Sequence, residues 1–203
     1  MDARLSDAGF FDFETPGLED RMLDLVAKKD LSTLGHSNRV AVLTREWAEF
    51  MASRGFWIGV NPSRIESAAR MHDVGKVMVP DSVLMKAGPL DAAERELMNA
   101  HAEAGYEMVR HHDASGYSSM AVRHHHERWD GEGYPLGLKG DEIPFQAQVV
   151  AIVDAFDAMT EDRVYRKGRS PVEAMAEIER CAGSHFSPDR VSEFVQFIHA
   201  RNG

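Results

Sequence analysis

The chain has 203 residues, of which 43% are hydrophobic and 28% charged, with one cysteine and a formal net charge of −10. This composition is typical of a single globular domain and excludes a disordered chain, a disulfide framework and a basic protein that coats a nucleic acid polymer. No apolar run reaches the ~18 residues that span a bilayer, and the N-terminus lacks an apolar signal segment, so we expect a cytoplasmic protein without a membrane partner in which Cys181 is buried.

Apolar residues recur at helical spacing along most of the chain, and no alternating run of strand length stands out, so the sequence predicts an all-α fold. Two helix starts carry clear signals: Asn61 before Pro62, and Asp91 three residues before Glu94 in a capping box. The expected helices cover residues 18–28, 40–51, 62–74, 91–110, 117–126, 144–158, 171–182 and 188–200.

One long segment, residues 130–143, has no helical pattern and holds four glycines. Irregular segments of this length are uncommon in compact domains and are often functional. We therefore expect this glycine-rich loop to contribute to a site.

Polar residues with metal-binding chemistry interrupt the apolar faces of the predicted helices. His72 shares a face with Ile65 and Ala68, and Asp73 follows it. A charged carboxylate beside an inward face is costly unless a cation compensates it. We expect Gly75 to end this helix and to leave the His72-Asp73 pair at a cavity wall.

Three further positions show the same anomaly. His101 lies at helical spacing from Leu97, Asp154 lies within the most apolar helix, and His125 and His126 are consecutive. Adjacent helical residues diverge by ~100°, so both histidines reach one cavity only if it is wide or holds more than one ion. One such histidine is more often a core residue, but together these residues favour a metal site. Imidazole and carboxylate without thiolate suit iron, manganese, zinc or nickel.

The order of the motifs resembles that of the HD-GYP family of HD-superfamily phosphohydrolases. The resemblance rests on His36 in the segment 35–40, His72-Asp73 with Lys76, His101, the segment 125–135 with its Gly-Tyr-Pro sequence, Asp154, and Arg163 with Arg166. It covers residues 18–203, which we expect to form one HD-GYP-like catalytic domain, a helical bundle with a glycine-rich loop, after an N-terminal extension of residues 1–17.

The resemblance implies hydrolysis of cyclic di-GMP to the linear dinucleotide, with GMP left open as a further product, by a hydroxide that bridges two divalent transition-metal ions. Iron or manganese is the metal that the family suggests. The implied ligands of one ion are His36, His72, Asp73 and Asp154, and those of the other are Asp73, His101, His125 and His126. Some family members have a Glu that helps to hold a third ion where this chain has Ser32, so we expect two.

The resemblance also implies roles toward the substrate. Lys76 would contact the scissile phosphate or the leaving oxygen, Arg163 and Arg166 would bind a substrate phosphate, and Tyr134 would stack on guanine or serve a docking surface. The alternatives are a solvated lysine at a helix end, a solvated basic segment, and a tyrosine that packs on its own loop. A regulatory or GGDEF-type signalling protein is the expected partner besides the cyclic dinucleotide.

Several residues near the motifs lie outside the implied ligand set. Asp157, Glu127 and Asp130 are candidates to orient a ligand histidine, and we expect His124 beside the ligands or at the surface. Two other functions stay open: a phosphohydrolase for another nucleotide, and a non-catalytic receptor or signalling scaffold for cyclic dinucleotides. A scaffold should have lost His72, Asp73 or Asp154, and the chain keeps all three. A purely structural bundle leaves the inward-facing acids unexplained.

Overall fold

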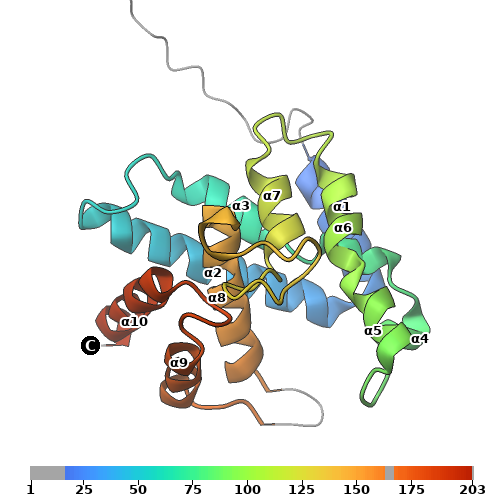
Figure 1. Ribbon diagram of the computed structural model, residues 1–203. Helices are drawn as coiled ribbons and strands as arrows, with labels where there is room; N and C mark the ends of the chain where they lie inside the picture. Colours follow the sequence, from blue (N-terminus) through green and yellow to red (C-terminus); the bar gives the residue numbers. More distant parts are fainter. Residues whose placement is uncertain (1–16, 163–166, 203) are drawn as a thin grey trace, which may run out of the picture.

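The computed structural model describes residues 17–162 and 167–202, and over these residues it is built from helices, with one isolated bridge between Ala182 and Phe186 as the only β-type pairing (Figure 1). This confirms the predicted all-α fold. The elements are α1 (Leu18–Lys29), α2 (Leu31–Ser53), α3 (Pro62–Met71), the 3-10 helix η1 (Val74–Met78), α4 (Asp81–Leu84), α5 (Ala92–Asn99), α6 (His101–Val109), α7 (Tyr117–His124), the 3-10 helix η2 (Gly140–Glu142), α8 (Phe145–Thr160), α9 (Pro171–Arg180) and α10 (Pro188–Asn202). None of the described helices combines the length and the apolarity needed to cross a bilayer.

Both predicted helix starts are confirmed. The Asn61 side chain accepts hydrogen bonds from the first free N–H groups of α3, and Pro62 occupies the first helical position. At the start of α5, Asp91 and Glu94 accept from each other's backbone N–H at 2.9 and 2.8 Å. These contacts satisfy donors that the helix itself leaves without partners, which is why the local sequence is sufficient to place both helix starts.

Two expected helix ends and the continuity of one expected helix were wrong. The helix predicted to run to residue 110 is broken at Ala100 into α5 and α6, and α7 ends two residues earlier than expected. Neither break follows a proline or glycine, so tertiary contacts decide both. The helix α3 ends at Met71, and Gly75 lies within η1, where a Cβ would come within 2.0 Å of the His101 carbonyl oxygen. Gly75 is therefore required for close packing and not as a helix terminator.

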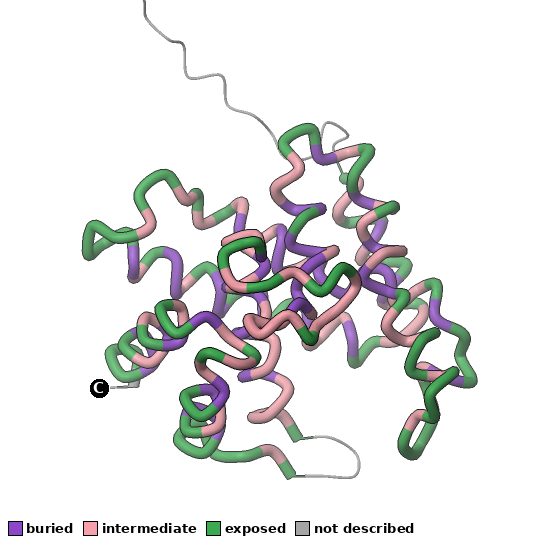
Figure 2. The backbone as a smooth tube through the Cα atoms, viewed as in Figure 1, coloured by how far each residue is buried: buried purple, intermediate pink, exposed green. Residues whose placement is uncertain are grey.

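Two buried apolar clusters meet at α3 and α7. The larger surrounds Trp47 and Phe194, whose ring centroids lie 4.9 Å apart, and it draws on α2, α8, α9 and α10. The smaller joins α1, η1 and α6 through residues such as Met71 and Val122. Figure 2 shows the buried positions gathered on the inward sides of these helices. Cys181 is among the buried residues, as expected. The residues that follow α3 and α7 consequently emerge where the two clusters adjoin.

The glycine-rich segment crosses the front of the bundle in Figure 1 and is attached to the turn between α9 and α10. The backbone N–H groups of Trp129 and Asp130 donate to carbonyl oxygens of that turn at 3.1 and 2.8 Å. Gly133 approaches the preceding backbone so closely that a Cβ would lie 2.3 Å from the Arg128 nitrogen. The start of the loop is thus hydrogen-bonded to the turn between α9 and α10, and Gly133 lets the loop fold back tightly on its own preceding residues.

Candidate metal centre

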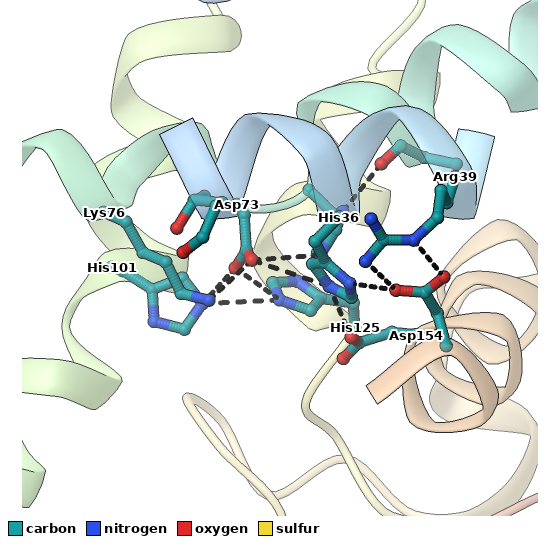
Figure 3. Close-up of polar contacts among 12 residues, drawn as sticks. His36, Arg39, Asp73, Lys76, His101, His125 and Asp154 are labelled. Atoms are coloured by element: carbon teal, nitrogen blue, oxygen red, sulfur yellow. Dashed lines mark hydrogen bonds and ion pairs between the residues drawn. The ribbon is translucent and has the colours of Figure 1, made fainter. Parts of the chain in front are cut away.

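Asp73 lies at the middle of the candidate site. Its side chain is 2% exposed because the chain turns from α3 into η1 at this point, between the two apolar clusters. One carboxylate oxygen, Oδ2, lies 3.2 Å from His72 Nε2 and 2.6 Å from Lys76 Nζ, and the other, Oδ1, lies 3.4 Å from His101 Nε2 (Figure 3). Neighbouring positive charge holds the pKa of Asp73 well below its usual range, against the opposing effect of burial. A buried anion therefore faces several imidazoles.

Three of these imidazoles are oriented in the same way. In His72, His101 and His125, Nδ1 lies 2.7, 2.7 and 2.8 Å from the backbone carbonyl oxygen three residues earlier. A carbonyl oxygen only accepts, so Nδ1 carries the proton and Nε2 presents its lone pair to the centre. The Nε2 atoms of His101 and His125 lie only 3.4 Å apart. Lone pairs that converge on one carboxylate require a cation between them.

The donor atoms form two groups that share Asp73. One contains Asp73, His101, His125 and His126, the other contains His36, His72 and Asp73, and within each group the ligand atoms lie within 4.8 Å of one another. His72 Nε2 is also buried without a hydrogen-bond partner in the described part of the chain. Both observations fit a pair of divalent transition-metal ions held by imidazole and carboxylate.

His36 and Asp154 are held on the other side of Asp73. His36 projects from α2, and its Nε2 lies 2.9 Å from Asp154 Oδ1 on α8 and 3.9 Å from Asp73. Asp154 is thus in contact with the expected ligand His36, although it lies outside the group of atoms closest to Asp73. Burial lowers the pKa of His36, but its hydrogen bonds with Asp154 and Asp157 outweigh burial and raise the pKa to about 9.

Asp157 orients His36. Its Oδ2 lies 2.7 Å from His36 Nδ1, while Arg39 donates to the same carboxylate through Nε and Nη2 at 2.8 and 2.9 Å. The carboxylate fixes the ring, and in the neutral imidazole it keeps the proton on Nδ1 and leaves Nε2 available to a metal ion. The expectation for Asp157 is therefore confirmed as far as the contact with His36 is concerned.

Asp157→Asn should weaken metal binding while the fold persists. An amide keeps the shape but supplies less charge to His36, and loss of such a partner costs ~10–100-fold in metal affinity. Calorimetric titration of the metal-stripped protein with Mn²⁺ measures the change. Asp141→Asn, at an exposed position in η2, serves as the matched control. Equal Mn²⁺ affinity in both variants would show that Asp157 does not act through His36.

The end of α7 explains how two consecutive histidines reach one cluster. The helix ends at His124, so the side chains of His125 and His126 need not diverge by the angle that separates adjacent residues of a helix. Their ring centroids lie 4.0 Å apart. Burial lowers the pKa of His126 to about 3, which keeps its imidazole neutral. Tyr134 stacks on His126 with centroids 4.8 Å apart and an interplanar angle of 29°. The Tyr134 side chain therefore packs on an expected ligand, and its role toward guanine or a partner stays a prediction.

The expected roles of Glu127 and Asp130 were wrong, because neither contacts an expected ligand histidine. Glu127 accepts from the backbone N–H groups of Leu136 and Leu138 at 2.8 and 3.0 Å, and Asp130 is paired with Arg128. Glu127 instead fixes the glycine-rich loop through these two backbone hydrogen bonds. The sequence does show an acid next to a loop rich in backbone donors. It does not identify the donors that Glu127 binds, because these are backbone N–H groups 9 and 11 residues away, which any residue type can supply.

Four other residues that the sequence analysis singled out have different outcomes. Lys76 reaches the centre through its ion pair with Asp73 and is 24% exposed, which does not fit a solvated lysine. Ser32 binds Asp30 with its hydroxyl at 2.8 Å as part of the α2 start. Arg163 and Arg166 lie outside the described residues.

A cavity of about 450 Å³ opens beside the centre. His125, His126 and Asp154 line it together with Tyr134 and Gly133 of the glycine-rich loop. This volume is within the range of small-molecule sites, which is ~300–1,000 Å³. The arrangement combines a candidate metal centre with room for an organic ligand.

Comparison with known proteins places the chain in a family. Residues 21–189 match the family model of the HD domain. A Thermotoga maritima protein named cyclic di-GMP phosphodiesterase is 36% identical over 170 residues, which cover 83% of this chain and 45% of the relative. A Vibrio cholerae protein named 3'3'-cGAMP-specific phosphodiesterase 2 is 34% identical over 180 residues, which cover 86% of this chain and 33% of the relative. The chain thus spans less than half the length of these relatives.

Solved structures agree on the fold. A Bdellovibrio bacteriovorus protein described as an HDG"Y"P protein has a TM-score of 0.62 at 17% identity, over 82% of this chain and 52% of that one. The HD domain of the L. monocytogenes phosphodiesterase PgpH has a TM-score of 0.62 at 16% identity, over 89% of this chain and 96% of that one. With its His-Asp pair at the middle of the site, the chain belongs to the HD-domain family.

Proposed function

We propose that this site hydrolyses a phosphodiester bond of a cyclic dinucleotide, with cyclic di-GMP as the first candidate. The observation that carries the proposal is the buried Asp73 carboxylate shared by two groups of imidazole donors. Bound there, two divalent ions of iron or manganese would activate a water for attack on phosphorus and neutralise charge on the phosphoryl oxygens.

The chain's own residues perform three tasks in this proposal. Asp73 would hold both ions, and backbone carbonyls fix the Nδ1 protons of His72, His101 and His125 so that each Nε2 is free to act as a ligand. His36, His126 and Asp154 would complete the ligand set. Lys76, 2.6 Å from the Asp73 carboxylate, places a positive charge where the scissile phosphate or the leaving oxygen would lie.

The substrate class is supported by the relatives, whose names specify cyclic di-GMP or 3'3'-cGAMP. Both ligands are cyclic dinucleotides, so the choice between them is the finer part of the proposal. The alternatives are another nucleotide substrate and a receptor that binds without hydrolysis. We favour catalysis because every ligand of the family pattern is present.

Turnover of a substrate panel by purified, metal-quantified protein tests the proposal. The panel contains cyclic di-GMP, 3'3'-cGAMP, the linear dinucleotide and mononucleotides, and products are separated by chromatography. We expect hydrolysis of cyclic di-GMP that is lost on chelation and restored by iron or manganese. Tight binding of a cyclic dinucleotide without turnover would favour the receptor instead. The same assay, with a GGDEF-type protein added, tests the proposed regulatory partner.

Arg163→Ala with Arg166→Ala should weaken substrate binding without removing metal. The resemblance assigns both arginines to a substrate phosphate, and a charge-assisted contact is worth ~1.5–3 kcal/mol, or tenfold to a hundredfold per residue. We expect KM for cyclic di-GMP to rise and kcat to hold if the contact is equal in ground and transition states. Unchanged kinetics would identify a solvated basic segment.

A further inference from the structure

The cavity beside the metal centre has a wall without an assigned role. Besides the expected ligands and the glycine-rich loop, Arg95 and Asn99 of α5 line it. These residues are four apart on one helix, so their side chains share a face. The α5 helix therefore presents a cationic and an amide group to the space that would hold the ligand.

Arg95 differs from the other charged residues of this cavity in its partners. Arg128 is paired with Asp130 and lies 3.6 Å from Glu132, and Glu127 accepts two backbone hydrogen bonds. The guanidinium of Arg95 makes a long hydrogen bond of 3.4 Å, from Nη2 to the carbonyl oxygen of Leu90. Over residues 17–162 and 167–202, no carboxylate lies within ion-pair distance of its guanidinium. In a chain with net charge −10, a cavity arginine without a carboxylate partner is suited to an anionic ligand.

The position of Arg95 is tied to the metal centre through α5. His101 Nδ1 lies 2.7 Å from the carbonyl oxygen of Met98, in the last turn of α5. The helix breaks immediately afterwards, at Ala100, so the α5 face that carries Arg95 and Asn99 is set by a contact of an expected ligand. Arg95 lies in the cavity lining but outside both groups of metal-binding atoms.

We propose that Arg95 binds the phosphate of the cyclic dinucleotide that is not being hydrolysed. This inference rests on the proposed function. A cyclic dinucleotide carries two phosphates on opposite sides of one ring, so the second phosphate must lie away from the metal ions when the first is above them. The planar guanidinium of arginine donates two parallel hydrogen bonds to phosphate oxygens. The guanidinium of Arg95 lies in the wall of the same cavity, at a different place from the expected metal ligands.

The test compares a substrate with two phosphates and one with a single phosphate. Cyclic di-GMP and bis(p-nitrophenyl) phosphate are assayed with the metal-loaded wild type, Arg95→Ala and Arg95→Lys. For Arg95→Ala we expect KM for cyclic di-GMP to rise about tenfold, and the ratio of kcat/KM for cyclic di-GMP to that for the single-phosphate diester to fall by the same factor. Arg95→Lys, which keeps the charge and loses the two-point geometry, should restore part of the ratio.

Arg21→Ala is the matched control because it removes the same charge from an exposed position of α1 that does not line the cavity. Its ratio should equal that of the wild type. An unchanged ratio in Arg95→Ala, or an equal loss on both diesters, overturns this inference while the proposed function stands. A wild type that hydrolyses the single-phosphate diester but no cyclic dinucleotide, or neither compound, overturns the proposed function and this inference with it.

Discussion

Asp73→Ala should abolish hydrolysis and remove metal from both groups of ligands at once. The carboxylate belongs to both groups, and its two oxygens face different imidazoles, so its removal affects both groups at once. Without it, three neutral imidazoles oriented by backbone carbonyls lose the charge that balances a divalent ion. Elemental analysis of the anaerobically purified wild type should approach two equivalents of a transition metal, and the variant should fall toward none.

Asp73→Asn separates charge from shape. The amide fills the same space but lacks the negative charge, and we expect the same loss of metal and turnover. Asp24→Ala, at an exposed position on α1, removes one acid and should change neither. Circular dichroism of each variant checks that the helices persist. Near-normal turnover in Asp73→Ala would end the two-metal proposal, and a third well-occupied ion in the wild type would show that Ser32 does not prevent its binding.

The helices were predictable where their starts and faces are local. Asn61 and Asp91 cap the helices that follow through contacts two and three residues away, so the pattern of residue types is sufficient. The break at Ala100 was not predictable, because nothing in the residue itself interrupts a helix. There the Met98 carbonyl meets the His101 ring in the folded protein. The early end of α7 has the same origin, since the following histidines turn into the centre.

The residues of the candidate site were predictable from the sequence, but the contacts that orient them were less so. An aspartate next to a histidine on an inward face already indicated a cation, and the structure brings Asp73 together with His72, His101 and His125. The shared tautomer of these histidines depends on side-chain rotation toward carbonyls, which leaves no mark in the sequence. The place of Arg95 in the cavity wall was not predictable either, because the sequence does not show which residues lie near an exposed arginine in the folded protein.

Gly75 was expected to end a helix, but the structure shows that it is needed for close packing. Its backbone has no left-handed conformation that would require glycine, yet a Cβ would lie 2.0 Å from the His101 carbonyl oxygen and 2.5 Å from the Gly105 nitrogen. Both neighbours are backbone atoms of α6, so no side chain can rotate away to make room. The absence of a side chain at position 75 lets η1, which follows Asp73, pack directly against the helix that begins with His101.

Gly75→Ala should therefore separate Asp73 from His101 and lower both stability and metal content. Overpacking of this kind costs ~1–3 kcal/mol or more, and each kcal/mol lowers Tm by ~2–4 °C in a domain of this size. His101 Nε2 lies 3.4 Å from Asp73 Oδ1, so a shift of α6 displaces a ligand atom directly. We expect the ion bound by Asp73, His101, His125 and His126 to be the one that is lost, with turnover falling in proportion.

Gly88→Ala is the matched control, because a Cβ there meets nothing within 4 Å and its backbone is not left-handed. Thermal melts and metal analysis of the two variants should differ sharply, with Gly88→Ala close to the wild type. Gly105→Ala adds a graded comparison: its Cβ would approach a Val122 methyl group at 2.7 Å, and a side-chain methyl yields more readily than backbone. A Gly75→Ala protein with wild-type Tm and two metal equivalents would show that α6 can move without displacing His101, and that the packing of η1 on α6 does not set the geometry of the centre.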